Sequence, residues 1–194
     1  MGPLVSANRA KVLAVALAVV GLGVLAFKRR AVAAAIGGKL TVAQLDQRYG
    51  PLRLGVDYTE GAQGRINVKP AWVAARIVSV TLFDGKIVKL HRDVAASFAA
   101  AYRAAVTESG YHPASVQTFV TRHILWDPAE GLSLHSYGIA VDFDPTLNPY
   151  GDNPSAKIRR FPAFIAAMER HGWEWGGRWS RKNRDDMHFQ RTAG

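Results

Sequence analysis

The segment 138–144 reads Gly-Ile-Ala-Val-Asp-Phe-Asp and alternates between bulky apolar residues and small or acidic ones. In an extended chain, alternate side chains share a face, so the apolar residues would face a core and Asp142 would face the opposite side. A spacing of seven residues would also align His135 with Asp142 on a helix, but the β-branched residues and Pro145 disfavour one. We therefore predict a β-strand on which Gly138, Ala140, Asp142 and Asp144 share a face that is nearly bare around Asp142.

The face of this strand that carries Asp142 could supply part of a metal-binding site. Small neighbours leave room beside Asp142, and Gly138 permits a turn that could bring His135 back over the strand. The chain has no cysteine, so imidazoles and carboxylates must hold any metal. A catalytic zinc site usually has three protein ligands. The candidate for the third is His188, the one remaining histidine in polar surroundings, which in an extended chain faces the same side as Gln190.

Three motifs occur in a fixed order: Ser-x-His-x-x-Gly-x-Ala-x-Asp at 133–142, Gly-Trp-Glu-Trp-Gly-Gly-x-Trp at 172–179, and Asp-x-x-His-Phe-Gln at 185–190. With them the chain resembles the zinc D-alanyl-D-alanine carboxypeptidases and L-alanyl-D-glutamate endopeptidases of bacteria and phages, and three ordered motifs are more specific than one short pattern. The resemblance covers the segment 111–190. It implies one Zn²⁺ ion held by His135, Asp142 and His188, with Asp185 as the general base.

The resemblance also implies substrate contacts around the metal. Arg122, which precedes the first motif, would hold a substrate carboxylate or carbonyl, while Ser133 and Trp179 would contact the substrate. Strict alternation along the last strand places Asp186, not Asp185, on the same side as His188, so Asp186 remains the second candidate for the base.

Two residues depart from the family pattern. Arg178 stands where these endopeptidases often carry an acid, and Met187 replaces the usual proline. Neither is a ligand or the base, so the departures bear on substrate preference and not on the metal.

The function implied is hydrolysis of a peptide bond in the stem peptide of peptidoglycan. The Trp-Gly-Gly-x-Trp segment favours the bond between L-Ala and D-Glu over the one between D-Ala and D-Ala. The competing hypothesis is a non-catalytic cell-wall-binding or virion structural module that retains the fold. The presence of a complete set of metal ligands and of a base argues against this hypothesis. A purely structural zinc domain fits less well, because such sites usually have four protein ligands and prefer cysteine.

The net charge of +10 could indicate a nucleic-acid partner. Half of it comes from residues 1–30, which contain no acid, and the chain shows no helix-turn-helix, zinc-finger or aromatic-basic motif. We therefore expect attraction to an anionic cell wall or membrane surface and no nucleic-acid partner.

Residues 12–27 form an unbroken apolar run between Lys11 and the basic residues 28–30. A membrane-spanning helix needs about 20 apolar residues, with a range of about 17 to 25, so this run is short. Three interpretations remain: an uncleaved membrane anchor, a cleaved signal peptide, and an apolar helix that docks on a partner in a virion or envelope assembly. We assign residues 1–38 to this anchor or signal segment and residues 39–194 to the zinc peptidase domain. The wall substrate implies an extracytoplasmic protein, membrane-anchored or secreted, and the resemblance allows a phage origin.

Local patterns predict the remaining elements. An Asp-Gly turn at 84–85 indicates a hairpin, and a strand at 115–122 would end in Arg122. His91, at the end of the hairpin, is expected at the surface. The expected elements are helices at 41–49, 93–109 and 160–171, strands at 75–81 and 86–91, and loops at 50–64 and 145–155. The predicted fold is therefore α+β, a small antiparallel sheet flanked by helices that carries the zinc site, with an N-terminal apolar helix.

Overall fold

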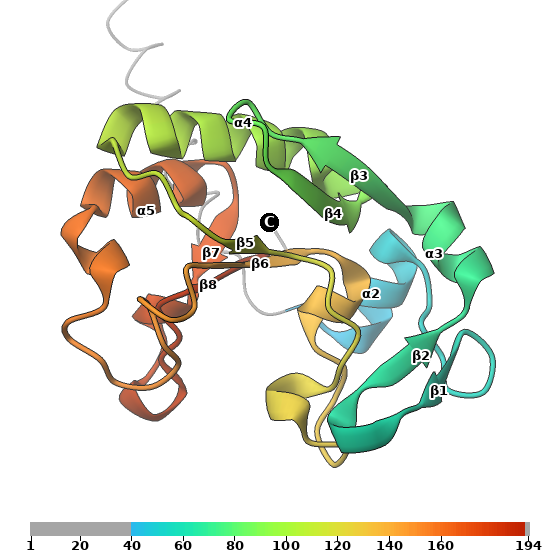
Figure 1. Cartoon of the computed structure of the whole chain (residues 1–194). Coiled ribbons are helices and arrows are strands. Elements are labelled where there is room, and N and C mark those ends of the chain that lie inside the picture. The colour runs from blue at the N-terminus through green and yellow to red at the C-terminus, as the bar shows by residue number, and fades with distance from the viewer. Residues whose placement is uncertain (1–39, 193–194) are drawn as a thin grey trace, which may run out of the picture. The chain divides into compact units, whose positions relative to one another are not determined.

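The computed structural model describes residues 40–192, which form an α+β fold of four α-helices and three small antiparallel sheets (Figure 1). The predicted fold class is thereby confirmed for this part of the chain. The apolar run 12–27 and the proposed boundary at 38/39 lie outside the described residues, so both remain predictions. Within residues 40–192, no helix combines the length and the apolar character needed to cross a bilayer.

The four-stranded sheet is the part of the fold that positions the site. Its strand order is β5-β6-β8-β7, and every neighbouring pair is antiparallel. The predicted alternating strand is β6, whose apolar residues Val141 and Phe143 are fully buried. The strands are β5 (Val116–Gln117), β6 (Ala140–Phe143), β7 (Trp173–Trp175) and β8 (His188–Arg191).

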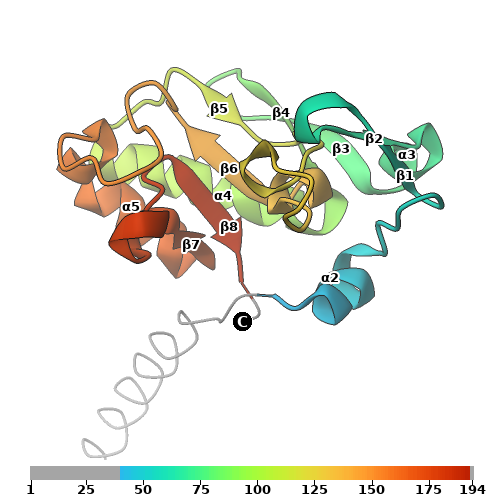
Figure 2. The same ribbon diagram turned by 90° about the horizontal axis from the view of Figure 1, so that it is seen from below.

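Two helices, α4 (Arg92–Ser109) and α5 (Pro162–Arg170), cover one face of this sheet, as Figures 1 and 2 both show. The apolar residues at every fourth position of α4, Val94, Phe98, Tyr102 and Val106, are buried, and Gly110 ends the helix with φ 68°. The ring of Phe143 on β6 packs against Phe98 and Tyr102 of α4, with ring centres 6.4 and 6.0 Å away. The helices therefore bury the apolar side of β6 and leave the side of Asp142 for another use.

The first part of the described chain differs from the prediction in two places. The predicted loop at 50–64 contains β1, which pairs with β2, and the start of the predicted strand at 75–81 is the end of α3. The predicted hairpin is confirmed, because β3 and β4 pair directly. These elements are α2 (Val42–Tyr49), β1 (Tyr58–Glu60), β2 (Ile66–Val68), α3 (Pro70–Arg76), β3 (Ile77–Thr81) and β4 (Ile87–His91).

The predicted strand at 115–122 was too long. Only β5 joins the sheet, and beyond it the chain runs toward the β1–β2 hairpin, where Arg122 forms an isolated antiparallel bridge with Arg65. The backbone N–H of Arg122 donates to the hydroxyl of Ser136, 2.8 Å away. Arg122 therefore does not end a regular strand, because it is held by partners that lie far away in the sequence.

The prediction for His91 was wrong. Only 3% of its surface is exposed, and its ring packs edge-on against that of Tyr49, with ring centres 5.2 Å apart. Nε2 donates to the carbonyl of Tyr49 at 3.1 Å, and Nδ1 accepts from the backbone N–H of Asp93, which caps α4. His91 is thus a structural residue that ties α2 to α4.

Candidate metal centre

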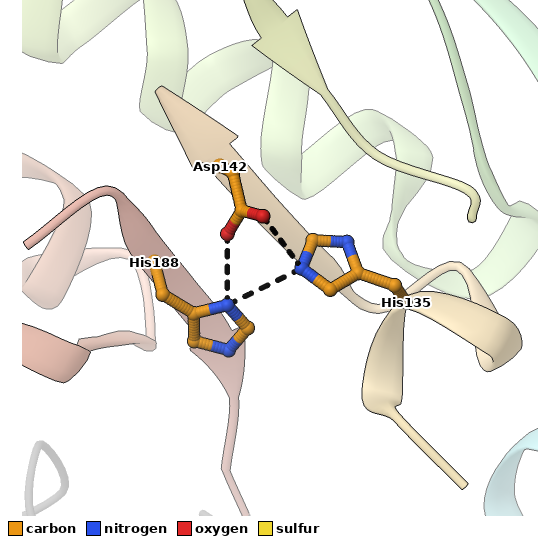
Figure 3. Close-up of side chains that lie close together, drawn as sticks. All are labelled: His135, Asp142 and His188. Atoms are coloured by element: carbon orange, nitrogen blue, oxygen red, sulfur yellow. Dashed lines mark hydrogen bonds and ion pairs between the residues drawn. The ribbon is translucent and has the colours of Figure 1, made fainter. Parts of the chain in front are cut away.

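His135, Asp142 and His188 meet at one point on the sheet face that α4 and α5 do not cover, and Figure 3 shows their side chains pointing toward one another. Nε2 of His135 lies 3.2 Å from Oδ2 of Asp142 and 3.3 Å from Nδ1 of His188. Nδ1 of His188 lies 2.9 Å from Oδ1 of Asp142. All three residues are buried. The convergence predicted from the sequence is therefore present, and we call these residues the triad.

Strand register brings two members of the triad together. Asp142 on β6 and His188 on β8 are direct cross-strand partners, so their side chains leave the sheet on the same face. Phe189 follows on the other face and is fully buried against the core, which fixes the register.

His135 reaches the triad from a short 3₁₀ helix, Leu134–Tyr137, that precedes β6. The hydroxyl of Ser133 caps this helix by accepting from the backbone N–H of His135 at 3.3 Å. Gly138 ends it in the left-handed region, with φ 69°. A Cβ at Gly138 would lie 2.7 Å from the backbone nitrogen of His91, so only glycine fits this turn.

A backbone carbonyl fixes the tautomer of His135. Nδ1 of the ring lies 2.7 Å from the carbonyl oxygen of Thr118. Because a carbonyl can only accept, Nδ1 must carry the hydrogen, and Nε2 presents its lone pair to the centre of the triad.

A chain of side chains fixes the tautomer of His188 in the same way. The amide nitrogen of Gln190 donates to Oε2 of Glu174 at 3.3 Å, so Oε1 of Gln190 faces Nε2 of His188, 3.1 Å away. Nε2 must then donate, and Nδ1 turns its lone pair to the triad. The other oxygen of Glu174 accepts from the indole N–H of Trp179 at 2.9 Å. We call Gln190, Glu174 and Trp179 the supporting chain.

The triad thus directs only lone pairs at its centre, an arrangement that requires a cation. The mutual distances are 2.9 to 3.3 Å, so the side chains would need to move apart only slightly to admit zinc. Tetrahedral Zn²⁺ with bonds of about 2.0–2.2 Å places its ligand atoms roughly 3.3–3.6 Å apart. Two imidazoles and one carboxylate can therefore hold a metal ion here.

Asp185 and Asp186, the two candidates for the general base, have different environments. Asp186 is fully buried and forms a bidentate pair with Arg159, with Nε–Oδ2 2.9 Å and Nη2–Oδ1 2.7 Å. Among the described residues, Oδ1 of Asp185 is buried and has no hydrogen-bond partner. Burial raises the pKa of Asp185 to about 6, partly opposed by His188 and supported by Asp142. Asp185 is therefore the carboxyl group that is free to exchange a proton near neutral pH.

Arg122 lies next to the triad without being a ligand. Burial lowers the pKa of its guanidinium, while Asp142 and Asp185 act to raise it, so the group remains a cation that faces both carboxylates. Its Nη1 donates to the carbonyl of His123 at 3.1 Å. This position suits the predicted contact with a substrate oxygen, which remains a prediction.

The other predicted residues are also placed. The ring of Trp179 lies 5.4 Å from that of His188, so it reaches the site as expected. Ser133 has a capping role, and its predicted contact with substrate remains a prediction. Arg178, one of the two departures from the family, pairs with Glu169 and bonds to no member of the triad.

Sequence reasoning missed the residues that orient the ligands. Thr118 acts through its backbone, so no side-chain pattern could reveal it. Gln190 could have been found, because alternation already placed it on the same side as His188. Glu174 lies opposite Gln190 in the β7–β8 register, which only the sheet pairing reveals.

Replacement of Gln190 by leucine is expected to weaken zinc binding by about 10- to 100-fold, because Nε2 of His188 would lose its acceptor and the ring its fixed tautomer. Competition with a chromophoric chelator measures the affinity. Gln117→Leu is the matched control, since Gln117 lies opposite Asp142 on β5 and makes no hydrogen bond to the triad. Equal zinc affinities for the two variants would show that the supporting chain does not orient His188.

Comparison with known proteins adds one finding. A family model described as D-alanyl-D-alanine carboxypeptidase matches residues 127–191, a segment that contains the triad, Asp185 and the supporting chain. The match confirms the family resemblance for this segment and supports a metallopeptidase, whereas Arg122 lies outside it. No match was found among curated proteins or among solved structures.

Proposed function

We propose that this chain is a zinc-dependent peptidase that hydrolyses a peptide bond in the stem peptide of peptidoglycan. The observation that carries the proposal is the buried triad of three converging lone-pair donors, with Asp185 beside it, whose buried Oδ1 has no hydrogen-bond partner among the described residues. The family match over the same residues supports the reaction class.

Zinc bound by His135, Asp142 and His188 would supply Lewis-acid chemistry, which acidifies water and polarises a carbonyl. Asp185 would accept the proton of the attacking water as the new carbon–oxygen bond forms. It would then donate that proton to the amine nitrogen as the carbon–nitrogen bond breaks. Arg122 would hold an oxygen of the substrate, either the reacting carbonyl or a nearby carboxylate.

The bond between L-Ala and D-Glu is the one we propose, with the bond between D-Ala and D-Ala as the alternative. The Trp-Gly-Gly-x-Trp segment favours the first, and in the structure it delivers Trp179 to the triad. In both substrates a carboxylate is attached to the carbon next to the scissile nitrogen, so Arg122 is suited to either. Such a substrate would place the domain outside the cytoplasm, with residues 12–27 as the proposed membrane or partner segment.

Incubation of the full-length chain with purified peptidoglycan tests the proposal. We expect new amino-terminal D-Glu, detected by mass spectrometry, because Asp185 and the triad form a complete hydrolytic set. A chelator should abolish the release, and added zinc should restore it. Free D-Ala in place of new D-Glu would identify the carboxypeptidase alternative.

The binding-module hypothesis predicts a different outcome of the same experiment. A non-catalytic wall-binding or virion component would sediment with peptidoglycan but release no new terminus, with or without zinc. That result would contradict the proposed hydrolysis.

A further inference from the structure

A tryptophan has two arginines beside it, and one of them, Arg122, interacts electrostatically with Asp142 of the metal centre. Trp126 is 41% exposed, and the guanidinium carbons of Arg65 and Arg122 lie 5.0 and 5.1 Å from the centre of its ring. Arg65 comes from the β1–β2 connection and forms a backbone bridge with Arg122. We call Arg65, Trp126 and Arg122 the Trp126 platform. Arg65 and Trp126 lie outside the segment that the family model matches.

The backbone under the platform is strained. Leu125 and Trp126 have φ angles of 53° and 60°, which non-glycine residues rarely adopt. Gly64 packs against this turn so closely that a Cβ would lie 2.1 Å from the carbonyl oxygen of Trp126. The backbone N–H of His123 donates to the carbonyl of Gly64 at 2.8 Å, which locks the two segments together. Such strain persists only where surrounding structure enforces it and is concentrated at functional sites.

The charge of the platform is only partly compensated. Arg122 faces Asp142 and Asp185, but within residues 40–192 no carboxylate forms an ion pair with Arg65. Glu60, the acid on the same hairpin, is engaged by Nε2 of His123 at 3.0 Å. Two guanidinium groups on one ring repel each other, and a bound anion would relieve that repulsion.

The geometry of the platform indicates what kind of anion it would bind. Because both guanidinium carbons lie near the same ring, the two cations are at most about 10 Å apart, the length of roughly three residues of extended peptide. Arg122 faces the metal centre, so Arg65 would meet a group further along the same substrate. We propose that Arg65 and Trp126 form a subsite for a second carboxylate of the substrate, on a residue up to three positions from the scissile bond. This inference rests on the proposed function.

Binding of two synthetic stem peptides tests the subsite. They would differ only in whether the side chain of the third residue ends in a carboxylate or a carboxamide. Calorimetry on full-length Asp185→Asn protein measures Kd without hydrolysis. We expect the carboxylate peptide to bind about fivefold more tightly, the value of one exposed ion pair near 1 kcal/mol. Arg65→Ala should remove this preference, and Arg65→Lys should keep most of it.

Arg103→Ala is the matched control, because Arg103 also stacks on an aromatic ring, that of Phe83, 5.0 Å away at the β3–β4 turn. It should leave the preference unchanged. A preference that survives in Arg65→Ala, an equal loss for both peptides, or no binding of either peptide would each overturn the subsite. Failure of wild-type protein with zinc to cut either peptide would instead contradict the proposed function, and the binding data would still decide on Arg65.

Discussion

Replacement of Asp185 by asparagine is expected to lower kcat for a synthetic stem peptide by about 10²- to 10⁴-fold, the usual contribution of a positioned general base. The amide has nearly the same size but cannot take a proton from water. Because Asp185 is not a member of the triad, zinc affinity should stay at the wild-type value. Mass spectrometry of the products gives the rate, and chelator competition gives the affinity.

Asp93→Asn is the control for this loss, since Asp93 is an exposed carboxylate on α4, which covers the opposite face of the sheet. It should retain the wild-type rate. A wild-type rate in Asp185→Asn would remove Asp185 from the mechanism. A loss of zinc together with activity would instead indicate that Asp185 supports the metal.

Replacement of Asp186 by alanine should act on stability, with an expected loss of about 3–5 kcal/mol in the free energy of unfolding. The fully buried carboxylate neutralises Arg159, whose guanidinium would be left without its partner beside the ring of Trp175. The indole N–H of Trp175 donates to the backbone carbonyl of Asp186, so this turn is part of the core. Denaturant unfolding measures the change.

Glu108→Ala provides the comparison for Asp186→Ala. Glu108 also forms an ion pair, in which both of its carboxylate oxygens accept from Nη2 of Arg170, but both side chains are about half exposed. Exposed pairs contribute about 0–1 kcal/mol, so this variant should change stability little. If Asp186→Ala lowered the free energy of unfolding as little as Glu108→Ala does, the ion pair of Asp186 with Arg159 would not be the structural contact described above.

The triad could be predicted because its signals are local. Alternation along β6 placed Asp142 on the bare face, and Gly138 marked the turn that returns His135. The same rule does not extend to Asp185 and Asp186, the two candidates for the base, because alternation assumes an extended chain and β8 begins only at His188. Asp185 lies in the turn before it, where the backbone N–H of His188 donates to the carbonyl of Asp185 at 3.3 Å.

Residues whose positions depend on distant partners could not be predicted in this way. His91 is buried by a contact with Tyr49, 42 residues earlier, and nothing in its immediate neighbourhood indicates this. Arg122 leaves the sheet because Ser136 and Arg65 hold its backbone. Hydrophobic periodicity indicates which face of a strand or helix a residue occupies. Contacts such as those of His91 and Arg122 depend instead on how segments far apart in the sequence pack together.

The triad, Asp185 and the supporting chain all lie within residues 133–190, whereas the Trp126 platform comes from earlier segments and is linked to them through the charge of Arg122. The proposed hydrolytic residues and the proposed substrate-selecting residues therefore lie in separate segments of the sequence. Under the proposed function, joint exchange of the β1–β2 connection and residues 122–132 would change which substrate is bound and leave the metal-binding residues intact.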